Sequence, residues 1–258
     1  MKSCLMHACM SRSSSIVLYC FQRFILVPVL DMSEITISST NWLAISLRNG
    51  AAVIFNLNDP QQWQYLQSTE TISTVKPSTT DDEEDNANDL NRNLIKFSPN
   101  GEKLAINGQN KQIYIYIPSE YASTKTYWQL QRVITVIKRA SALDLTNEFL
   151  LIADKSGDVY KTDFSIENNL TLTADDCIMG HLSMLLDIAF ARTQENEEYL
   201  LTADRDEKIR LSHYPNAYNI QGYCLGHREF VSHVKLINSN HILSTSGDGE
   251  YLPCSQPL

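Results

Sequence analysis

Short apolar runs alternate with tight polar turns along most of the chain, and one such pattern recurs. Each copy opens with an apolar run, passes through a polar turn and, in the first four copies, resumes an alternation of apolar and polar residues. The copies cover residues 42–56, 103–117, 150–164, 200–214 and 242–256. Because alternation places side chains on the two faces of a strand, the pattern predicts a β-hairpin in each copy.

The spacing of these hairpins predicts how they assemble. Successive turns lie about 40 to 60 residues apart, which is the period of a four-stranded propeller blade and not of a helical solenoid. Further strand-like runs fit between the hairpins, at residues 94–98, 142–145, 184–190 and 231–237. Helical periodicity is nowhere sustained, so the sequence predicts an all-β fold.

Two dipeptides sharpen this prediction. Gly180-His181 and Gly226-His227 stand 46 residues apart, each just before an inner-strand pattern. They resemble the glycine-histidine signature of WD repeats. The Trp-Asp pair that ends the WD consensus is absent, since Ser212-His213 stand there in one repeat. The resemblance predicts a WD-type β-propeller with some divergent blades.

In WD repeats the histidine bonds to a turn aspartate of its own blade, which suits imidazole because one ring nitrogen donates and the other accepts. By position the partners are Asp206 for His181 and Asp248 for His227. Asp154 lies at an equivalent turn, where aspartate caps the backbone. We expect these residues to be structural.

Composition and charge exclude classes of protein with an extreme composition. The 258 residues are 43% hydrophobic and 20% charged, which is ordinary for a globular protein. The net charge of -9 argues against coating nucleic acid by bulk charge, but residues 80–89 supply six of the acids and no base. Without that run the charge is about -3, so a local basic face is possible. We expect a disordered acidic insert at about 76–92.

Residues 1–31 differ from the rest. Their apolar stretch is broken by Gln22 and Arg23, and its pieces are shorter than the ~20 residues of a membrane span. A targeting peptide is one reading. We favour a partly disordered extension outside the repeat pattern, with Met32 as the natural start. The six cysteines include no Cys-x-x-Cys pair, so we expect reduced, mostly buried thiols and no metal site.

Five blocks go beyond a generic repeat. They are residues 153–160, 180–189, 201–210, 226–232 and 246–249. In this order and spacing they resemble the WD-repeat, non-catalytic subunit of the tRNA guanine-N7 methyltransferase. The resemblance is dense from Lys138 to Asp248 and looser from Met32 to Ile137.

This resemblance implies a division of labour. In the family a Rossmann-like partner binds S-adenosylmethionine and methylates a guanine of the tRNA variable loop. The WD subunit has no catalytic residue or cofactor, stabilises the partner, helps to seat tRNA and resides in the nucleus. The sequence agrees, because it shows no glycine-rich phosphate loop, no paired acid and base and no metal-ligand spacing.

The resemblance also implies two surfaces. Asp206, Glu207, Lys208 and Arg210 are expected to meet the catalytic subunit, where charged contacts set orientation more than affinity. Alternation places Lys208 and Arg210 on one face of a strand, as an exposed pair at the rim.

Lys138, Arg139, Lys155 and Arg205 are expected to lie toward the tRNA, where basic side chains orient phosphates without reading bases. Whether these charges contact RNA or only face solvent is open from the sequence.

The end of the chain departs from the family. Residues 250–258 contain Pro253 and Pro257, which remove backbone donors, so we expect a divergent tail and a break in the sheet at Glu250. A seven-bladed ring needs roughly 280 to 315 residues, and 227 follow the first 31. The prediction is therefore an incomplete propeller over 32–249, with about four to five of seven blades, from a truncated gene model or isoform.

Two other functions stay open from the sequence. The chain could be a WD-repeat adaptor of another complex, such as a substrate receptor of a ubiquitin ligase. It could also be an enzyme in its own right, although no candidate catalytic site supports this.

Overall fold

The computed structural model describes residues 8–10, 15–20, 23–28, 32–47, 50–59, 61–66, 93–108, 111–119, 126–238 and 241–254. The predicted acidic insert at about 76–92 lies outside them. No helix in these ranges is long and apolar enough to cross a bilayer. The N-terminal strands β1 (Ala8–Met10), β2 (Ser15–Cys20) and β3 (Arg23–Pro28) form a separate small antiparallel sheet, which the sequence pattern did not predict.

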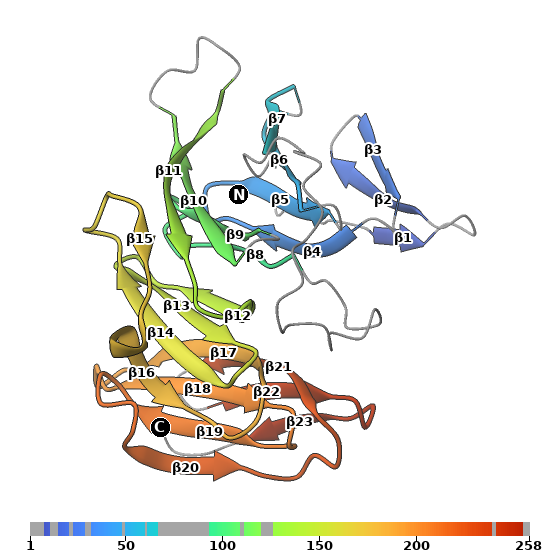
Figure 1. Ribbon diagram of the computed structural model, residues 1–258. Helices are drawn as coiled ribbons and strands as arrows, with labels where there is room; N and C mark the ends of the chain where they lie inside the picture. Colours follow the sequence, from blue (N-terminus) through green and yellow to red (C-terminus); the bar gives the residue numbers. More distant parts are fainter. Residues whose placement is uncertain are drawn as a thin grey trace, which may run out of the picture.

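Five further sheets follow in chain order (Figure 1). The first contains β4 (Met32–Ile37), β5 (Trp42–Leu47), β6 (Ala52–Asn56) and β7 (Trp63–Leu66). The second contains β8 (Ile95–Phe97), β9 (Leu104–Asn107), β10 (Gln112–Pro118) and β11 (Trp128–Thr135), joined by β15 (Leu170–Thr171). The third contains β12 (Ala140–Leu145), β13 (Phe149–Asp154), β14 (Asp158–Asp163) and β16 (Cys177–Gly180).

The fourth sheet contains β17 (Leu185–Arg192), β18 (Glu198–Asp204), β19 (Ile209–His213) and β20 (Ile220–Cys224). The fifth contains β21 (Val231–Asn238), β22 (His241–Ser246) and β23 (Tyr251–Cys254). Apart from a 3-10 turn at Ala174–Asp176, the elements named here are strands. The predicted all-β architecture is confirmed, and five sheets agree with four to five blades.

The first strands of the five sheets lie next to one another in the order β4, β8, β12, β17, β21, so the sheets form an arc about a common centre (Figure 1). This is the blade arrangement of a propeller. The predicted break at Glu250 is wrong, because β23 pairs with β22 beyond it and Pro253 stands opposite Leu243. A proline is tolerated there because β23 is an edge strand, whose outer backbone donors need no partner.

Apolar layers between adjacent sheets form the core. Ile115 and Ile134 of the second sheet pack with Leu143 and Ile152 of the third, and all four are buried. Every residue of β13 is buried, since this middle strand is covered on both faces. Burial of this apolar surface is the main force that holds the blades against one another.

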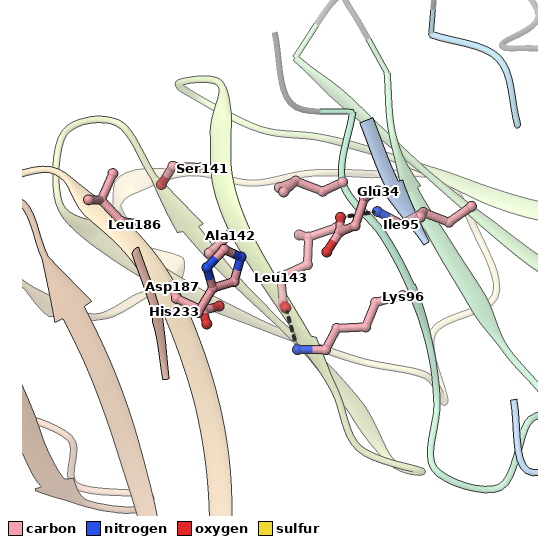
Figure 2. Close-up of a pocket in the computed structure, with 10 residues that line it drawn as sticks. Glu34, Ile95, Lys96, Ser141, Ala142, Leu143, Leu186, Asp187 and His233 are labelled. Carbon is pink, nitrogen blue, oxygen red and sulfur yellow. Dashed lines mark hydrogen bonds between the residues drawn. The ribbon is translucent and has the colours of Figure 1, made fainter. Parts of the chain in front are cut away.

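Charged side chains join the inner strands around the centre (Figure 2). Glu34 of β4 accepts from the backbone N–H of Ile95 (2.9 Å), and Lys96 of β8 donates to the carbonyl of Leu143 (3.1 Å). Asp144 of β12 accepts from the backbone N–H of Phe190 (2.6 Å). Asp187 of β17 accepts from the backbone N–H of Val234 (2.8 Å). Lys96 also pairs with Asp144 at 2.9 Å. One ionic side chain thus links each neighbouring pair of inner strands. The pocket at the centre is lined by three of them, Glu34, Lys96 and Asp187, so it is a structural junction.

Candidate interaction surface

Turns and connections of the last three sheets gather at one end of the blades. In each sheet the turn after the second strand bonds to the connection that precedes the first strand: Lys155 N–H donates to Arg139 O (3.2 Å), Arg205 N–H to Met184 O (3.0 Å) and Gly247 N–H to Phe230 O (3.0 Å). We name this end the turn face. It comprises turns 154–158, 204–208 and 246–250 and connections 136–139, 180–184 and 224–230.

The turn face holds the four residues expected toward tRNA. Lys138 and Arg205 are exposed, and Arg139 and Lys155 are half-buried. The backbone bond between Lys155 and Arg139 brings these two residues together, as the sequence predicted. The four positions span two adjacent blades, so they form part of one surface.

Turn 204–208 holds three of the four residues expected at the protein interface. Asp206, Glu207 and Lys208 are all exposed. The backbone of Glu207 has a φ of 72°, in the left-handed region, which disfavours side chains. The fold therefore imposes this turn shape and presents its charges to solvent.

Arg210 differs from its expected position. Its side chain is buried, with the residue only 9% exposed. Its guanidinium donates to the carbonyls of Gly180 (3.3 Å) and Ala217 (3.0 Å) and to Ser212 Oγ (3.0 Å), and burial lowers its pKa. The prediction of a rim-exposed Arg210 is therefore wrong, because its side chain turns inward to the carbonyl of Gly180 in the third sheet and that of Ala217 in its own sheet, which require a donor.

The histidine network of the fifth sheet is confirmed. His227 Nδ1 donates to Asp248 Oδ2 at 3.0 Å, and Nε2 lies 2.9 Å from Ser244 Oγ. Asp248 also accepts from the backbone N–H groups of Arg228 (3.0 Å) and Glu250 (2.9 Å), and these bonds hold its pKa well below the ordinary value. The network ties connection 224–230 to turn 246–250.

In the fourth sheet the predicted aspartate is wrong. His181 Nε2 lies 2.9 Å from Thr202 Oγ1, but Nδ1 faces Asp204 Oδ2 at 3.8 Å and not Asp206. Asp204 is buried at the end of β18 and accepts from the backbone N–H groups of Asp206 (2.9 Å) and Lys208 (3.0 Å). Asp206 is exposed. The buried residue therefore takes the role, because only it points back into the blade.

The third sheet repeats the turn without a histidine. Asp154 Oδ1 accepts from the backbone N–H groups of Ser156 (2.8 Å) and Asp158 (3.1 Å). Its Oδ2 is buried and has no hydrogen-bond partner among the described residues. Asp154 corresponds to Asp204 and not, as the sequence suggested, to Asp206, since each ends the second strand opposite the start of the first.

The two glycines of the dipeptides have backbone roles. Gly226 has a φ of 148°, which a residue with a side chain rarely adopts. Gly180 ends β16, and its carbonyl accepts from Arg210. Both therefore serve the fold, as the WD resemblance predicted.

The sequence missed the apolar part of the turn face. Large apolar residues are exposed on all three connections: Ile137, Leu182, Leu225 and Phe230. Leu182 is fully exposed. The sequence pattern cannot show that these residues are exposed, because an apolar residue in a connection cannot be told from the first apolar residue of the next strand.

Among the described residues no three His, Cys, Asp or Glu side chains cluster in a way that could hold a metal ion. Cys177 is a free thiol, whose pKa is raised by burial and by Asp158. Cys224 is disulfide-bonded, so the expectation of reduced thiols is wrong for that residue.

A known family model matches part of the chain. Residues 166–252 match the family model described as the tRNA methyltransferase TRM82 WD40 domain. The resemblance found in the sequence is confirmed. The matched segment contains connections 180–184 and 224–230 and turns 204–208 and 246–250.

Three relatives are named as tRNA (guanine-N(7)-)-methyltransferase non-catalytic subunits. The chain is 41% identical to WDR4 of Mus musculus over 160 residues, 40% to wdr4 of Danio rerio over 158, and 36% to TRM82 of Candida glabrata over 167. The alignments cover 59%, 59% and 62% of this chain. They cover 35%, 35% and 39% of the relatives, so the chain spans little more than a third of their length.

A solved structure supports the fold alone. A chain from a crystal structure of the mitotic checkpoint complex superposes with a TM-score of 0.57 at 16% identity. The superposition covers 84% of this chain and 58% of that chain. At this level of identity the likeness shows shared architecture only.

Proposed function

We propose that this protein is a non-catalytic WD-repeat subunit of a tRNA (guanine-N7) methyltransferase. It binds and stabilises the catalytic subunit, which carries S-adenosylmethionine, and helps to position tRNA for methylation of a variable-loop guanine. The observation that carries the proposal is the match of residues 166–252 to the TRM82 WD40 domain, since this segment builds most of the turn face.

The geometry supports a binding role. Turn 204–208 presents Asp206, Glu207 and Lys208 to solvent on a backbone fixed by the carboxylate of Asp204. Charges on a preformed turn lose little entropy on binding, so they favour one orientation of a partner. Arg210 supports the interface from within by holding Gly180, the first residue of connection 180–184, in place.

Basic residues on this turn and on the neighbouring blade complete the proposal. Lys138, Arg139, Lys155 and Arg205 supply positive charge on a chain that is acidic as a whole. Contacts of lysine and arginine with phosphates position a nucleic acid without reading its sequence. In this proposal the chain acts in the nucleus, binds no cofactor itself and works in a heterodimer.

A reconstitution tests this function. The catalytic subunit of the same organism is assayed for N7-methylguanosine in tRNA, alone and with the full 258-residue chain. We expect the two proteins to copurify and methylation to rise at least tenfold when the chain is present. Absence of a complex, together with unchanged methylation, would overturn the proposal. The chain alone should form no N7-methylguanosine when supplied with S-adenosylmethionine.

A further inference from the structure

Leu182 is unusual because a large aliphatic side chain stands fully exposed on a rigid backbone. The preceding residue, His181, donates its N–H to Gly157 O at 2.9 Å and is anchored through its ring to Thr202. Two residues after Leu182, the carbonyl of Met184 accepts from Arg205 N–H at 3.0 Å. The connection is therefore held on both sides, and Leu182 is presented to solvent by a fixed scaffold.

Close packing under the connection adds to this rigidity. A Cβ atom at Gly157 would come within 2.8 Å of the carbonyl oxygen of His181 and within 2.6 Å of that of Ser183. Only glycine lets turn 154–158 approach the connection so closely. Leu182 thus stands between the turns of two blades.

Other apolar side chains extend the same surface. Leu225 directly follows Cys224, which pairs with Ile209 at the end of turn 204–208, and Leu225 is largely exposed. Phe230 is partly exposed and lies over Gly247, where a Cβ would meet its ring at 2.5 Å. Exposed apolar residues on consecutive connections are typical of a binding surface.

Charges around Leu182 indicate the chemistry of the partner. Arg205 and Lys208 stand on the same turn as Asp206 and Glu207, and all four are exposed. A polyanion such as RNA would be attracted by the first pair and repelled by the second. Moreover, RNA is contacted chiefly through phosphates and by stacking on aromatic or guanidinium groups, not on an aliphatic side chain. Mixed charges around an apolar centre are typical of a surface that binds another folded protein.

We infer that Leu182 is the apolar anchor of the interface with the catalytic methyltransferase subunit, an inference that rests on the proposed function. The partner surface has a leucine-sized apolar pocket, an acidic group opposite Lys208 and a basic group opposite Glu207. The charges set the orientation, and burial of the leucine adds to the affinity.

The test compares two substitutions of exposed apolar residues in the full-length chain. Leu182→Glu places a charge at the anchor. Tyr218→Glu is the matched control, because Tyr218 is also largely exposed but lies in the turn between the third and fourth strands of its sheet. Since antiparallel strands alternate in direction, that turn is at the opposite end of the blade from the turn face. Affinity for the catalytic subunit is measured by calorimetry, with circular dichroism as a folding check.

We expect Leu182→Glu to weaken binding at least tenfold, Tyr218→Glu to bind as the wild type, and all three proteins to melt alike. If Leu182→Glu bound with wild-type affinity, the assignment of Leu182 as the anchor would be overturned and the proposed function would stand. Failure of the wild type to bind would overturn both. Unchanged binding of the catalytic subunit with weaker tRNA binding in Leu182→Glu would assign the residue to RNA and overturn the inference.

Discussion

Turns 154–158 and 204–208, in adjacent blades, share a backbone design but differ in what lies beneath it. Both begin with an aspartate whose Oδ1 accepts two backbone N–H groups. In the fourth sheet the second carboxylate oxygen faces His181, whereas Oδ2 of Asp154 in the third sheet is buried without a hydrogen-bond partner in the described part of the chain. The cap therefore does not depend on the histidine.

The positions beneath the two turns explain the difference. His181 stands four residues before β17, and the residue four before β12 is Val136. Thr202 stands two before Asp204, and the residue two before Asp154 is Ile152. Val136 and Ile152 are buried in one apolar cluster, while Thr202 and His181 bond to each other.

The carboxylates respond in opposite directions. Burial raises the pKa of Asp154 and is the largest influence on it, although the backbone donors oppose it. For Asp204 burial also acts to raise the pKa, but His181 and the backbone N–H groups outweigh it and the pKa is lowered. The imidazole of His181 thus accounts for part of the difference, because it favours the charged form of Asp204.

Replacement of Arg210 is expected to have the largest effect. Arg210→Leu leaves the carbonyls of Gly180 and Ala217 without their donor and should lower the free energy of unfolding by about 3 kcal/mol. Tyr160 holds the equivalent place in the third sheet, because it pairs with Ile152 as Arg210 pairs with Thr202. Tyr160→Phe should cost about 1 kcal/mol or less. Urea unfolding followed by circular dichroism measures both, and equal losses would contradict the difference between the blades.

Replacement of His181 and Thr202 by the apolar pair of the third sheet is expected to have the second-largest effect. His181→Val removes the partner of Thr202 and Asp204 and should cost about 2 kcal/mol, since it leaves buried polar groups unsatisfied. Adding Thr202→Ile recreates the pair formed by Val136 and Ile152 and should recover about 1 kcal/mol of that loss. A double-mutant cycle from thermal or urea unfolding gives the coupling. Strictly additive losses would show that the two side chains act independently.

The smallest effect is expected at the caps themselves. Asp204→Asn should cost about 1 to 2 kcal/mol near neutral pH, because it removes the carboxylate charge that His181 and the backbone N–H groups of Asp206 and Lys208 stabilise. Asp154→Asn should change stability by less than about 0.5 kcal/mol, since no histidine stabilises its charge and the amide oxygen can still cap the turn. Equal effects at the two sites would contradict the pKa directions.

The pH dependence of these two variants sharpens the comparison. The lowered pKa of Asp204 means that its contribution to stability is complete above the unfolded value of about 3.9 and is lost as the pH falls through the folded value. The raised pKa of Asp154 means that its cost is full above the folded value and vanishes below about 3.9. On acidification the wild type should lose its advantage over Asp204→Asn and gain on Asp154→Asn.

The sequence predicted the architecture well because hairpin alternation and turn signals are local. The five hairpins, the inner strands and the pairing of His227 with Asp248 follow from such patterns. The position of Lys155 beside Arg139 follows from the blade repeat in the same way.

What the sequence missed depends on three-dimensional burial. Strand alternation assigned Arg210 to an exposed face, but carbonyls from two other segments surround it. Turn spacing assigned His181 to Asp206, although the buried Asp204 lies closer to its ring. Leu182 gave no signal, because a connection has no periodicity from which exposure can be judged.

The central claim is that the turn face binds the catalytic subunit, and amide hydrogen exchange of the full chain with and without that subunit tests it most directly. We predict slower exchange in residues 180–184, 204–208 and 224–230, with turns 146–148 and 214–219 at the opposite end unchanged. Protection confined to that opposite end, with the turn face exchanging as in the free chain, would contradict the account.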